Sequence, residues 1–363
     1  MCRARRFADQ FYWTAQSGMN DMQRFRWIVV TLSSLFLLPS FAQPVKRGSI
    51  RGMITDAETG EALPYTDVFL SNTTLGDAAD DDGGYVILNI PPGSYQLVVS
   101  RIGYRVEVQD ITVSAGTTLR DVRLSVKSIE GEEISVVAVS DKQWQRDLKE
   151  FQSYFIGETA NAKKCSIINP EILSFQRDAA TNDLVARSDS FLVIDNRALG
   201  YRIEIILDSF RWGRAGGFYL IYPRYYACPA ENARQARRWE GNRRETFFSS
   251  MRNFFASLAT GAYAEDYIIS RRRQTYDFIK TAVLDSLTIS CIDSTPGLRR
   301  LQFDGVLQVE RRAGGSSNLY LNYGFVDFDS RGNIYPADAV KISGHWGQYR
   351  VADSLPFDYW PEE

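Results

Sequence analysis

The single histidine of the chain, His345, is the side chain whose ordinary pKa best suits general acid–base chemistry at neutral pH. As a lone general base it would pair with Asp353 or Asp358, which follow it in the sequence. It has no nucleophile partner in a recognisable motif, and its neighbours Gly344 and Trp346 are typical of a packing or hydrogen-bonding residue. We therefore expect a structural role for His345 and predict no catalytic residue.

One histidine also restricts metal chemistry. Zinc sites with two histidines need one histidine more than the chain has, and no Cys-x-x-Cys spacing replaces them. The signature loops for phosphate and dinucleotide binding do not occur, nor does the Gly-x-Ser-x-Gly nucleophile motif. The paired carboxylates of a glycoside hydrolase stay open, because the sequence gives no separations between its many acidic residues. We predict no metal site and no cofactor.

Four aspartates, Asp77, Asp80, Asp81 and Asp82, precede Gly83 and supply oxygen atoms of the kind that bind Ca²⁺. Their spacing lacks the regular positions and the distal glutamate of an EF-hand loop. Asp-Gly is itself a frequent turn pair. We expect a solvated hairpin here, with calcium binding as the alternative.

Arginines gather over residues 231–259, among aromatic residues at helical spacing. Such a stripe can bind nucleic acid or an anionic lipid surface. Glu231, Glu240 and Glu245 interrupt the charge, and the aromatic face needs a core, so we expect a packed helix with the arginines on its solvated face. The short run Arg271-Arg-Arg273 is interpreted as surface in the same way.

Aromatic side chains over residues 212–226 offer platforms on which sugar rings can stack. Core packing accounts for them equally well, so carbohydrate binding is an alternative and not the first prediction. The residues concerned are Trp212, Tyr219, Tyr222, Tyr225 and Tyr226.

The elements that position these residues fall into two parts, as a chain of 363 residues with 44% hydrophobic residues suggests. Over residues 45–126, short alternating runs are separated by turn signals, which predicts a small antiparallel sandwich. Pro91-Pro-Gly93 places a tight connection before the next strand, because proline cannot donate to a strand ladder. The predicted strands are 49–54, 65–70, 84–89, 94–102, 105–113 and 118–125.

The second part, residues 130–363, mixes helices and strands. Apolar residues at helical spacing predict a helix over 141–155, and a longer helix over 231–259 is expected to split at Gly241. The strands between them alternate as in a curved antiparallel sheet, and Asp329-Ser-Arg-Gly-Asn333 indicates a hairpin. We predict a mainly β fold with an α+β second domain. The strands expected here are 172–176, 183–188, 191–196, 200–210, 281–292, 299–311, 317–327 and 333–344.

Residues 22–42 have the basic, apolar and small-residue parts of a secretory signal, with cleavage expected after Ala42. The apolar run is shorter than the ~20 residues of a spanning helix, although retention as an anchor is the alternative. Residues 1–21 show no signal-like pattern and are interpreted as an upstream mis-start or a disordered segment. No later stretch is long and apolar enough to span a bilayer. We predict an exported protein, in the periplasm or at the outer membrane or cell surface.

Charge and cysteine content limit the partners and the crosslinks. Removing residues 1–42 takes five arginines and two aspartates from the 42 basic and 44 acidic residues and leaves a net charge of about −5, which argues against nucleic acid as a partner. Cys165, Cys228 and Cys291 remain, an odd number that allows at most one internal disulfide. Export permits that bond, spacing cannot choose the pair, and three buried thiols are the alternative.

A series of short motifs gives residues 48–124 a family resemblance. They are Gly48-Ser-Ile-Arg-Gly52, the turn over 56–64, Asp82-Gly-Gly-Tyr85, Ile90-Pro-Pro-Gly-Ser-Tyr95 and Arg101-Ile-Gly-Tyr104. The stretch resembles the carboxypeptidase-regulatory-like, transthyretin-like domain found in exported proteins of Bacteroidota-type bacteria. It departs from the pattern at residues 77–82, where the family more often has a threonine before an Asp-x-Asp-Gly turn. The resemblance implies a prealbumin-like sandwich and no reaction.

The second part resembles uncharacterised exported proteins that are named only for a first domain of this kind. Motifs such as Ile168-Asn-Pro-Glu171 and Gly344-His-Trp-Gly347 carry this resemblance. We predict a non-enzymatic cell-envelope module that binds or assembles with an envelope protein or a glycan, and edge strands of the sandwich offer a route for strand addition. The alternatives are a carbohydrate-binding protein and a hydrolase in the second domain.

Overall fold

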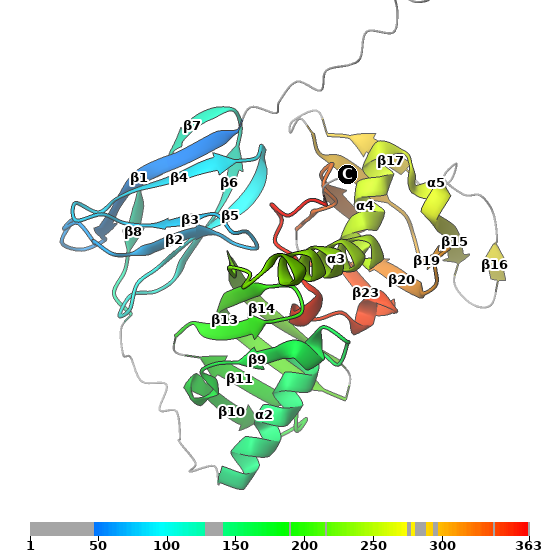
Figure 1. The fold of residues 1–363 in the computed structure, drawn as a ribbon, viewed down its shortest axis with the longest axis horizontal. Coiled ribbons are helices and arrows are strands. Elements are labelled where there is room, and N and C mark those ends of the chain that lie inside the picture. Colours follow the sequence, from blue (N-terminus) through cyan, green and yellow to red (C-terminus); the bar gives the residue numbers. More distant parts are fainter. Residues whose placement is uncertain are drawn as a thin grey trace, which may run out of the picture. The chain divides into compact units, whose positions relative to one another are not determined.

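The computed structural model describes residues 47–127, 141–188, 190–214, 216–273, 277–279, 288–292, 297–336 and 338–361, all within one compact unit, Lys46–Glu363. The predicted signal and the segment before it lie outside the described residues. Within these ranges no helix combines the length and apolar character needed to cross a membrane. The fold is mainly β with few helices, as predicted from the sequence (Figure 1).

The first strands form the predicted sandwich of two sheets (Figure 1). Alternate apolar side chains meet between the sheets and are fully buried, among them Ile50, Val68 and Leu97. One sheet consists of β4 (Gly84–Ile90), β1 (Gly48–Asp56), β7 (Gly116–Leu119) and β8 (Val122–Leu124). The other has the order β3 (Gly76–Ala78), β2 (Asp67–Leu70), β5 (Gly93–Ser100), β6 (Glu107–Val113). The sandwich differs from a purely antiparallel one in that β1 pairs in parallel with β7 and β8.

The strand predicted over 118–125 is interrupted at Arg120 and Asp121, which separate β7 from β8. The Arg120 N–H donates to the Arg51 carbonyl at 2.9 Å, and the Met53 N–H donates to the Asp121 carboxylate at 2.9 Å. A Cβ at Gly52 would overlap the Arg120 carbonyl, so this approach requires glycine. Between its pairing with β7 and its pairing with β8, β1 thus bonds to the Asp121 side chain instead of to a strand.

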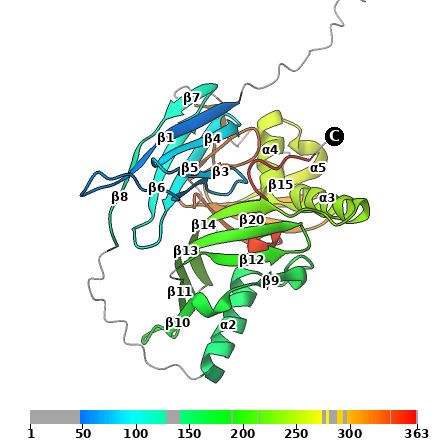
Figure 2. The same cartoon turned by 60° about the vertical axis from the view of Figure 1, so that its left-hand side comes forward.

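The first sheet of the second part is antiparallel throughout and carries helix α2 (Asp141–Phe155) with the predicted bounds (Figure 2). Phe151 and Phe155 of α2 pack on Phe210 and are fully buried, and Gly157 with φ +101° follows the end of the helix. The sheet order is β10 (Leu173–Arg177), β11 (Leu184–Ser188), β13 (Tyr201–Gly213), β12 (Leu192–Asn196), β9 (Cys165–Ile167), and β14 (Gly216–Ala227), which the sequence did not predict, also pairs with β13.

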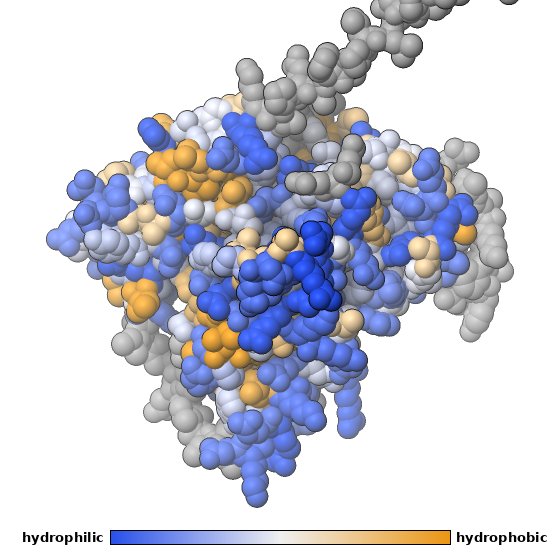
Figure 3. Space-filling view, in the orientation of Figure 1, coloured by the Kyte–Doolittle hydropathy of each residue, from blue (hydrophilic) through white to orange (hydrophobic). Residues whose placement is uncertain are grey.

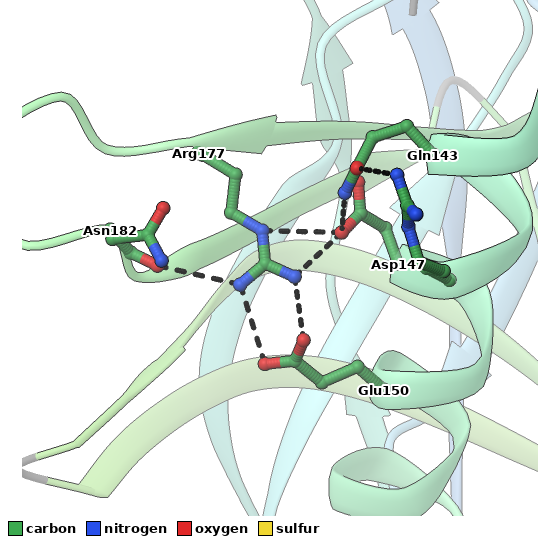
Figure 4. A network of polar contacts seen from close by, with 6 residues as sticks. Gln143, Asp147, Glu150, Arg177 and Asn182 are labelled. Carbon is green, nitrogen blue, oxygen red and sulfur yellow. Dashed lines mark hydrogen bonds and ion pairs between the residues drawn. The ribbon is translucent and has the colours of Figure 1, made fainter. Parts of the chain in front are cut away.

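An ionic network around the buried Asp147 attaches α2 to this sheet (Figure 4). Arg177 of β10 donates to Asp147 at 2.6 Å and to Glu150 at 2.5 Å, both carboxylates being on α2. Gln143, one turn before Asp147, donates to the same carboxylate at 2.9 Å. Asp147 is therefore buried, and its Oδ1 atom accepts from both Arg177 and Gln143.

The predicted break of the long helix at Gly241 is wrong. Helix α3 (Ala233–Ser249) runs through Gly241, because a single helical glycine costs only about 1 kcal/mol relative to alanine. The break falls at Ser250, whose extended backbone ends α3 and whose hydroxyl accepts from the Asn253 N–H to cap α4 (Met251–Thr260). Helix α5 (Tyr263–Asp266) follows.

The remaining strands form two sheets around a core that includes Phe254, Phe255 and Trp346. Glycines in turns, Gly305 (φ +80°) and Gly324 (φ +74°), divide the long strands predicted over 299–311 and 317–327. The hairpin at Asp329–Asn333 is confirmed. One sheet is β16 (Asp277–Ile279), β15 (Tyr267–Arg273), β19 (Val306–Arg311), β20 (Ser316–Leu321), β23 (Val340–Gly344); the other is β17 (Thr288–Cys291), β18 (Arg299–Gln302), β21 (Phe325–Phe328), β22 (Ile334–Tyr335). Single 3-10 turns lie at Ala162–Lys164, Pro170–Ile172, Trp346–Gln348 and Val351–Asp353.

Candidate functional site

An open groove of about 530 Å³ lies on the sandwich, beside the sheet formed by β4, β1 and β7. It combines apolar side chains, three carboxylates, one guanidinium and small residues that leave space between them. Its lining consists of Arg51, Gly52, Met53, Asp77, Ala78, Asp80, Gly84, Tyr85, Val86, Leu119 and Asp121. We refer to this site as the sandwich groove.

Strand register explains why apolar side chains line the sandwich groove. Ile50 and Ile54 of β1 point into the core, so Arg51 and Met53 between them point outward. Val86 of β4 and Leu119 of β7 both lie opposite Arg51. Met53, Val86 and Leu119 are 43%, 36% and 75% exposed, and Figure 3 shows an orange, hydrophobic patch over these strands.

Each carboxylate of the sandwich groove accepts a hydrogen bond from a strand backbone. Asp77 accepts from the Val86 N–H at 2.8 Å, and Asp80 accepts from the Gly84 N–H at 2.7 Å. Asp121 accepts from the Met53 N–H at 2.9 Å. In every case one carboxylate oxygen is used, and the other has no hydrogen-bond partner among the residues that the structure describes. The groove thus presents three carboxylates, each oriented by a backbone N–H.

The same bonds close the outer edge of β4. Within the described ranges β4 pairs with β1 alone, which makes it an edge strand. Its N–H groups at Gly84 and Val86 are taken by side-chain carboxylates, so a partner strand cannot pair there without displacing them. Strand β6, at an edge of the other sheet, pairs with β5 and has no such cap in the described part of the chain. The predicted route of strand addition is therefore blocked at this stretch of β4.

The expected hairpin at the four aspartates is wrong, because β3, which contains Asp77, and β4 belong to different sheets; the three later aspartates form a turn between them. Asp80 accepts from the Asp82 N–H at 3.0 Å, and Gly83 has a φ of +80°. Asp81 instead accepts from the Tyr65 hydroxyl, while Asp77 is bonded to β4. Among the described residues no three acidic, cysteine or histidine side chains are grouped so that they could hold a metal ion.

In the described structure His345 contacts a tyrosine hydroxyl and not Asp353 or Asp358, the carboxylates suggested as its partners. Its Nε2 atom lies 3.0 Å from the Tyr349 hydroxyl. Asp358 accepts from the Thr74 N–H at 2.9 Å, and Asp353 accepts from the Thr159 hydroxyl at 2.9 Å. Neither carboxylate has a hydrogen bond to His345 within the described ranges.

Sequence reasoning missed a buried polar cluster around Asp353. Besides Thr159, the Asn161 amide donates to this carboxylate at 3.1 Å, and burial raises the pKa of Asp353. The nearby Cys165 thiol donates to the Asn161 carbonyl, and burial raises its pKa to about 12. A protonated thiol is a poor nucleophile, so the cluster favours structure over catalysis. Cys165, Cys228 and Cys291 are all free thiols.

The aromatic residues considered as sugar platforms are mostly engaged in packing. Tyr225 is buried, Tyr219 meets Phe155 edge-on at 5.2 Å, and Trp212 stacks on Tyr154 at 4.9 Å. Tyr226 donates to Glu204 at 2.9 Å and lies under the Arg224 guanidinium, while Tyr222 is partly buried. These side chains do not form one open platform within the described structure.

The arginine-rich helices divide into a solvated and a structural set. Arg234, Arg237 and Arg238 on α3 are exposed, as predicted, and Figure 3 shows a hydrophilic surface over α3. Arg252 on α4 is partly buried, and this desolvation lowers its pKa to about 10. Its guanidinium donates to the carbonyl oxygens of Arg331, Pro356, Phe357 and Tyr359.

Comparisons with known proteins find a match for the first part of the chain. Residues 50–136 match the family model of the CarboxypepD_reg-like domain. No curated protein matches the chain.

Solved structures with a local likeness include a pilus 2b backbone protein of group B streptococcus (18% identity, 25% of this chain, 47% of that chain, TM-score 0.20) and a minor pilin of Streptococcus agalactiae (13%, 24%, 48%, 0.21). A third is a DUF3823 family protein from Bacteroides uniformis (9%, 50%, 100%, 0.18). The chain spans about half the length of the two pilus proteins.

Proposed function

We propose that this chain, whose residues 50–136 match a CarboxypepD_reg-like domain, is a non-enzymatic binding or assembly module of the cell envelope. We propose further that the sandwich groove is its binding surface. The observation that carries the proposal is the exposure of Met53, Val86 and Leu119 around Arg51, along an open groove. Apolar side chains gathered in this way are typical of interaction sites.

The energetic reason is the cost of leaving these side chains in water. Each Å² of apolar surface that a partner covers contributes about 25 cal/mol to association. Leu119 gains most from such cover, because it has the largest exposed fraction of the three. A partner that fits the groove would therefore bind through Leu119 first.

The non-enzymatic part of the proposal is supported by how the candidate catalytic groups are used. Asp353 and Asp358 accept hydrogen bonds from Thr159 and Thr74, and His345 contacts Tyr349. A hydrolase in the second domain would need a pocket into which such groups converge. The groups named here are instead tied to neighbouring chain segments.

In-cell crosslinking of the tagged chain, followed by purification from envelope fractions, tests the proposal. The expected result is one stoichiometric envelope protein, which is lost with Leu119→Asp. Ile102→Asp is the matched control, because Ile102 is 98% exposed on the same domain and does not line the groove. Recovery of the chain alone, or equal loss of partner in both variants, would contradict binding at the sandwich groove.

Carbohydrate binding is a second candidate, favoured by one observation on the sheet β15–β19–β20–β23. Gln308, Asn318 and Ser343 lie opposite one another on adjacent strands and form a row of uncharged hydrogen-bonding groups. Tyr320 lies on the same strand as Asn318 and is 36% exposed, as a ring that stacks on a sugar must be. Glycan that copurifies with the chain, and is lost with Tyr320→Ala, would support this role.

A further inference from the structure

The electrostatics of the sandwich groove restrict what it can bind. Asp77, Asp80 and Asp121 line it together with a single cation, Arg51, so the lining carries an excess of negative charge. One oxygen of each carboxylate is fixed by a backbone N–H, which orients the group without neutralising it. An anionic occupant would meet three carboxylates, whereas a cationic one would find preformed acceptors.

The apolar lining restricts the occupant in a second way. A small cation would pair with the carboxylates and leave Met53, Val86 and Leu119 in water. The three side chains come from three different strands, so covering them requires an occupant that crosses the sheet. A polypeptide segment with apolar and basic side chains meets both requirements.

The closed edge of β4 determines how such a segment is held. Because Asp77 and Asp80 already accept from the Val86 and Gly84 N–H groups, pairing along this edge is blocked. Where it passes Gly84 and Val86, the segment therefore docks through its side chains across the sheet. Arg51, opposite both Val86 and Leu119, lies where its guanidinium can donate to backbone carbonyl oxygens of the segment.

We infer that the occupant of the sandwich groove is an extended segment of a partner protein that directs lysine or arginine side chains toward Asp77 and Asp80 beside β4 and toward Asp121 after β7, and apolar side chains toward Met53, Val86 and Leu119. This inference rests on the proposed function and adds the chemical class of the partner.

Selection of random peptides displayed on phage against the full chain tests the inference. Enriched peptides are expected to combine a basic residue with apolar neighbours and to lose binding to Leu119→Asp but not to Ile102→Asp. For the strongest synthetic peptide, replacing its basic residue with glutamine should weaken binding about tenfold, as loss of a charge-assisted bond does. The double variant Asp77→Asn/Asp121→Asn, which keeps oxygen acceptors for the two backbone N–H groups, should bind the unmodified peptide more weakly by a similar factor.

The outcomes separate the inference from the proposed function. Peptides that need Leu119 but carry no basic residue would overturn the inference and leave the groove as a binding surface. Competition by spermidine at the same concentration as the peptide would overturn it in favour of a small cation. Absence of enriched peptides, or binding that is insensitive to Leu119→Asp, would contradict both.

Discussion

Arg177 of β10 donates to Asp147 of α2 at 2.6 Å, and the carboxylate that receives this bond is only 3% exposed. Glu150, one turn further along α2, accepts from the same guanidinium nitrogen at 2.5 Å. The arginine thus joins a helix to a sheet edge through two carboxylates, as Figure 4 shows. Removing the Arg177 charge therefore leaves the buried Asp147 carboxylate without its ionic partner.

Replacing Arg177 with methionine should lower the free energy of unfolding by about 3 kcal/mol, the low end for breaking a buried ion pair, because Gln143 still bonds to Asp147. Urea unfolding followed by far-UV circular dichroism measures the change. Arg202→Met is the control, since Arg202 pairs with Asp195 at 2.8 Å but is 52% exposed, and its loss should cost less than about 1 kcal/mol. Equal losses in both variants would show that the Asp147 network has no special role.

The elements that the sequence predicts well are those whose signal is local. Helix α2 has its predicted bounds because apolar side chains at helical spacing and Gly157 beyond its end are both visible in the sequence. The interruption between β7 and β8 is not predictable from the sequence. It depends on the close approach of the Arg120 carbonyl to Gly52 of β1, which is far away in the sequence. The break at Ser250 instead of Gly241 shows that a cap can outweigh a weak helix former.

The sandwich groove belongs to the unpredictable part for the same reason. Arg51, Val86 and Leu119 are far apart in the sequence and become neighbours only through strand register. The sequence did show the aspartates near Gly83, but their bonds to β4 depend on how β3 meets that strand. Alternation alone predicts which residues point outward, not which of them share a groove.

Two glycines should respond in opposite ways to substitution by alanine. Gly52→Ala should destabilise the sandwich strongly, because the added Cβ would overlap the backbone of Arg120, which cannot swing aside as a side chain can. Gly241→Ala should raise the free energy of unfolding by up to about 1 kcal/mol, because Gly241 lies in an exposed helix interior with open space around it. Thermal denaturation of both variants measures the contrast. A neutral Gly52→Ala would argue against the close approach of β1 to Arg120.

Cys165 should resist alkylation in the folded protein. Burial raises its pKa to about 12, so almost no thiolate exists at pH 8, and the side chain is partly covered. Cys291 is exposed and serves as the internal control. Mass spectrometry after brief iodoacetamide treatment should find Cys291 modified and Cys165 unmodified, with both modified after unfolding in urea. Equal modification before unfolding, or a disulfide between any two cysteines, would contradict the described arrangement.

Asp353 should give the protein a stability contribution that falls as pH rises. Burial is the main cause that raises its pKa above the ordinary 3.8, so at a pH between the two pKa values the folded state holds a proton that the unfolded state has released. The contribution is fully present below about pH 4 and is lost as pH rises through the folded pKa, because the unfolded carboxyl then binds fewer protons than the folded one.

The variant Asp353→Asn lacks this titration but keeps an oxygen that can accept from Thr159. Its free energy of unfolding, measured in urea from about pH 4 to about pH 7, should therefore increase relative to that of the wild-type protein as pH rises. Asp195→Asn is a suitable control, because Asp195 belongs to the partly exposed pair with Arg202. A difference between Asp353→Asn and wild type that stays constant with pH would show that Asp353 is charged throughout this range, and the bonds from Thr159 and Asn161 would then outweigh its burial.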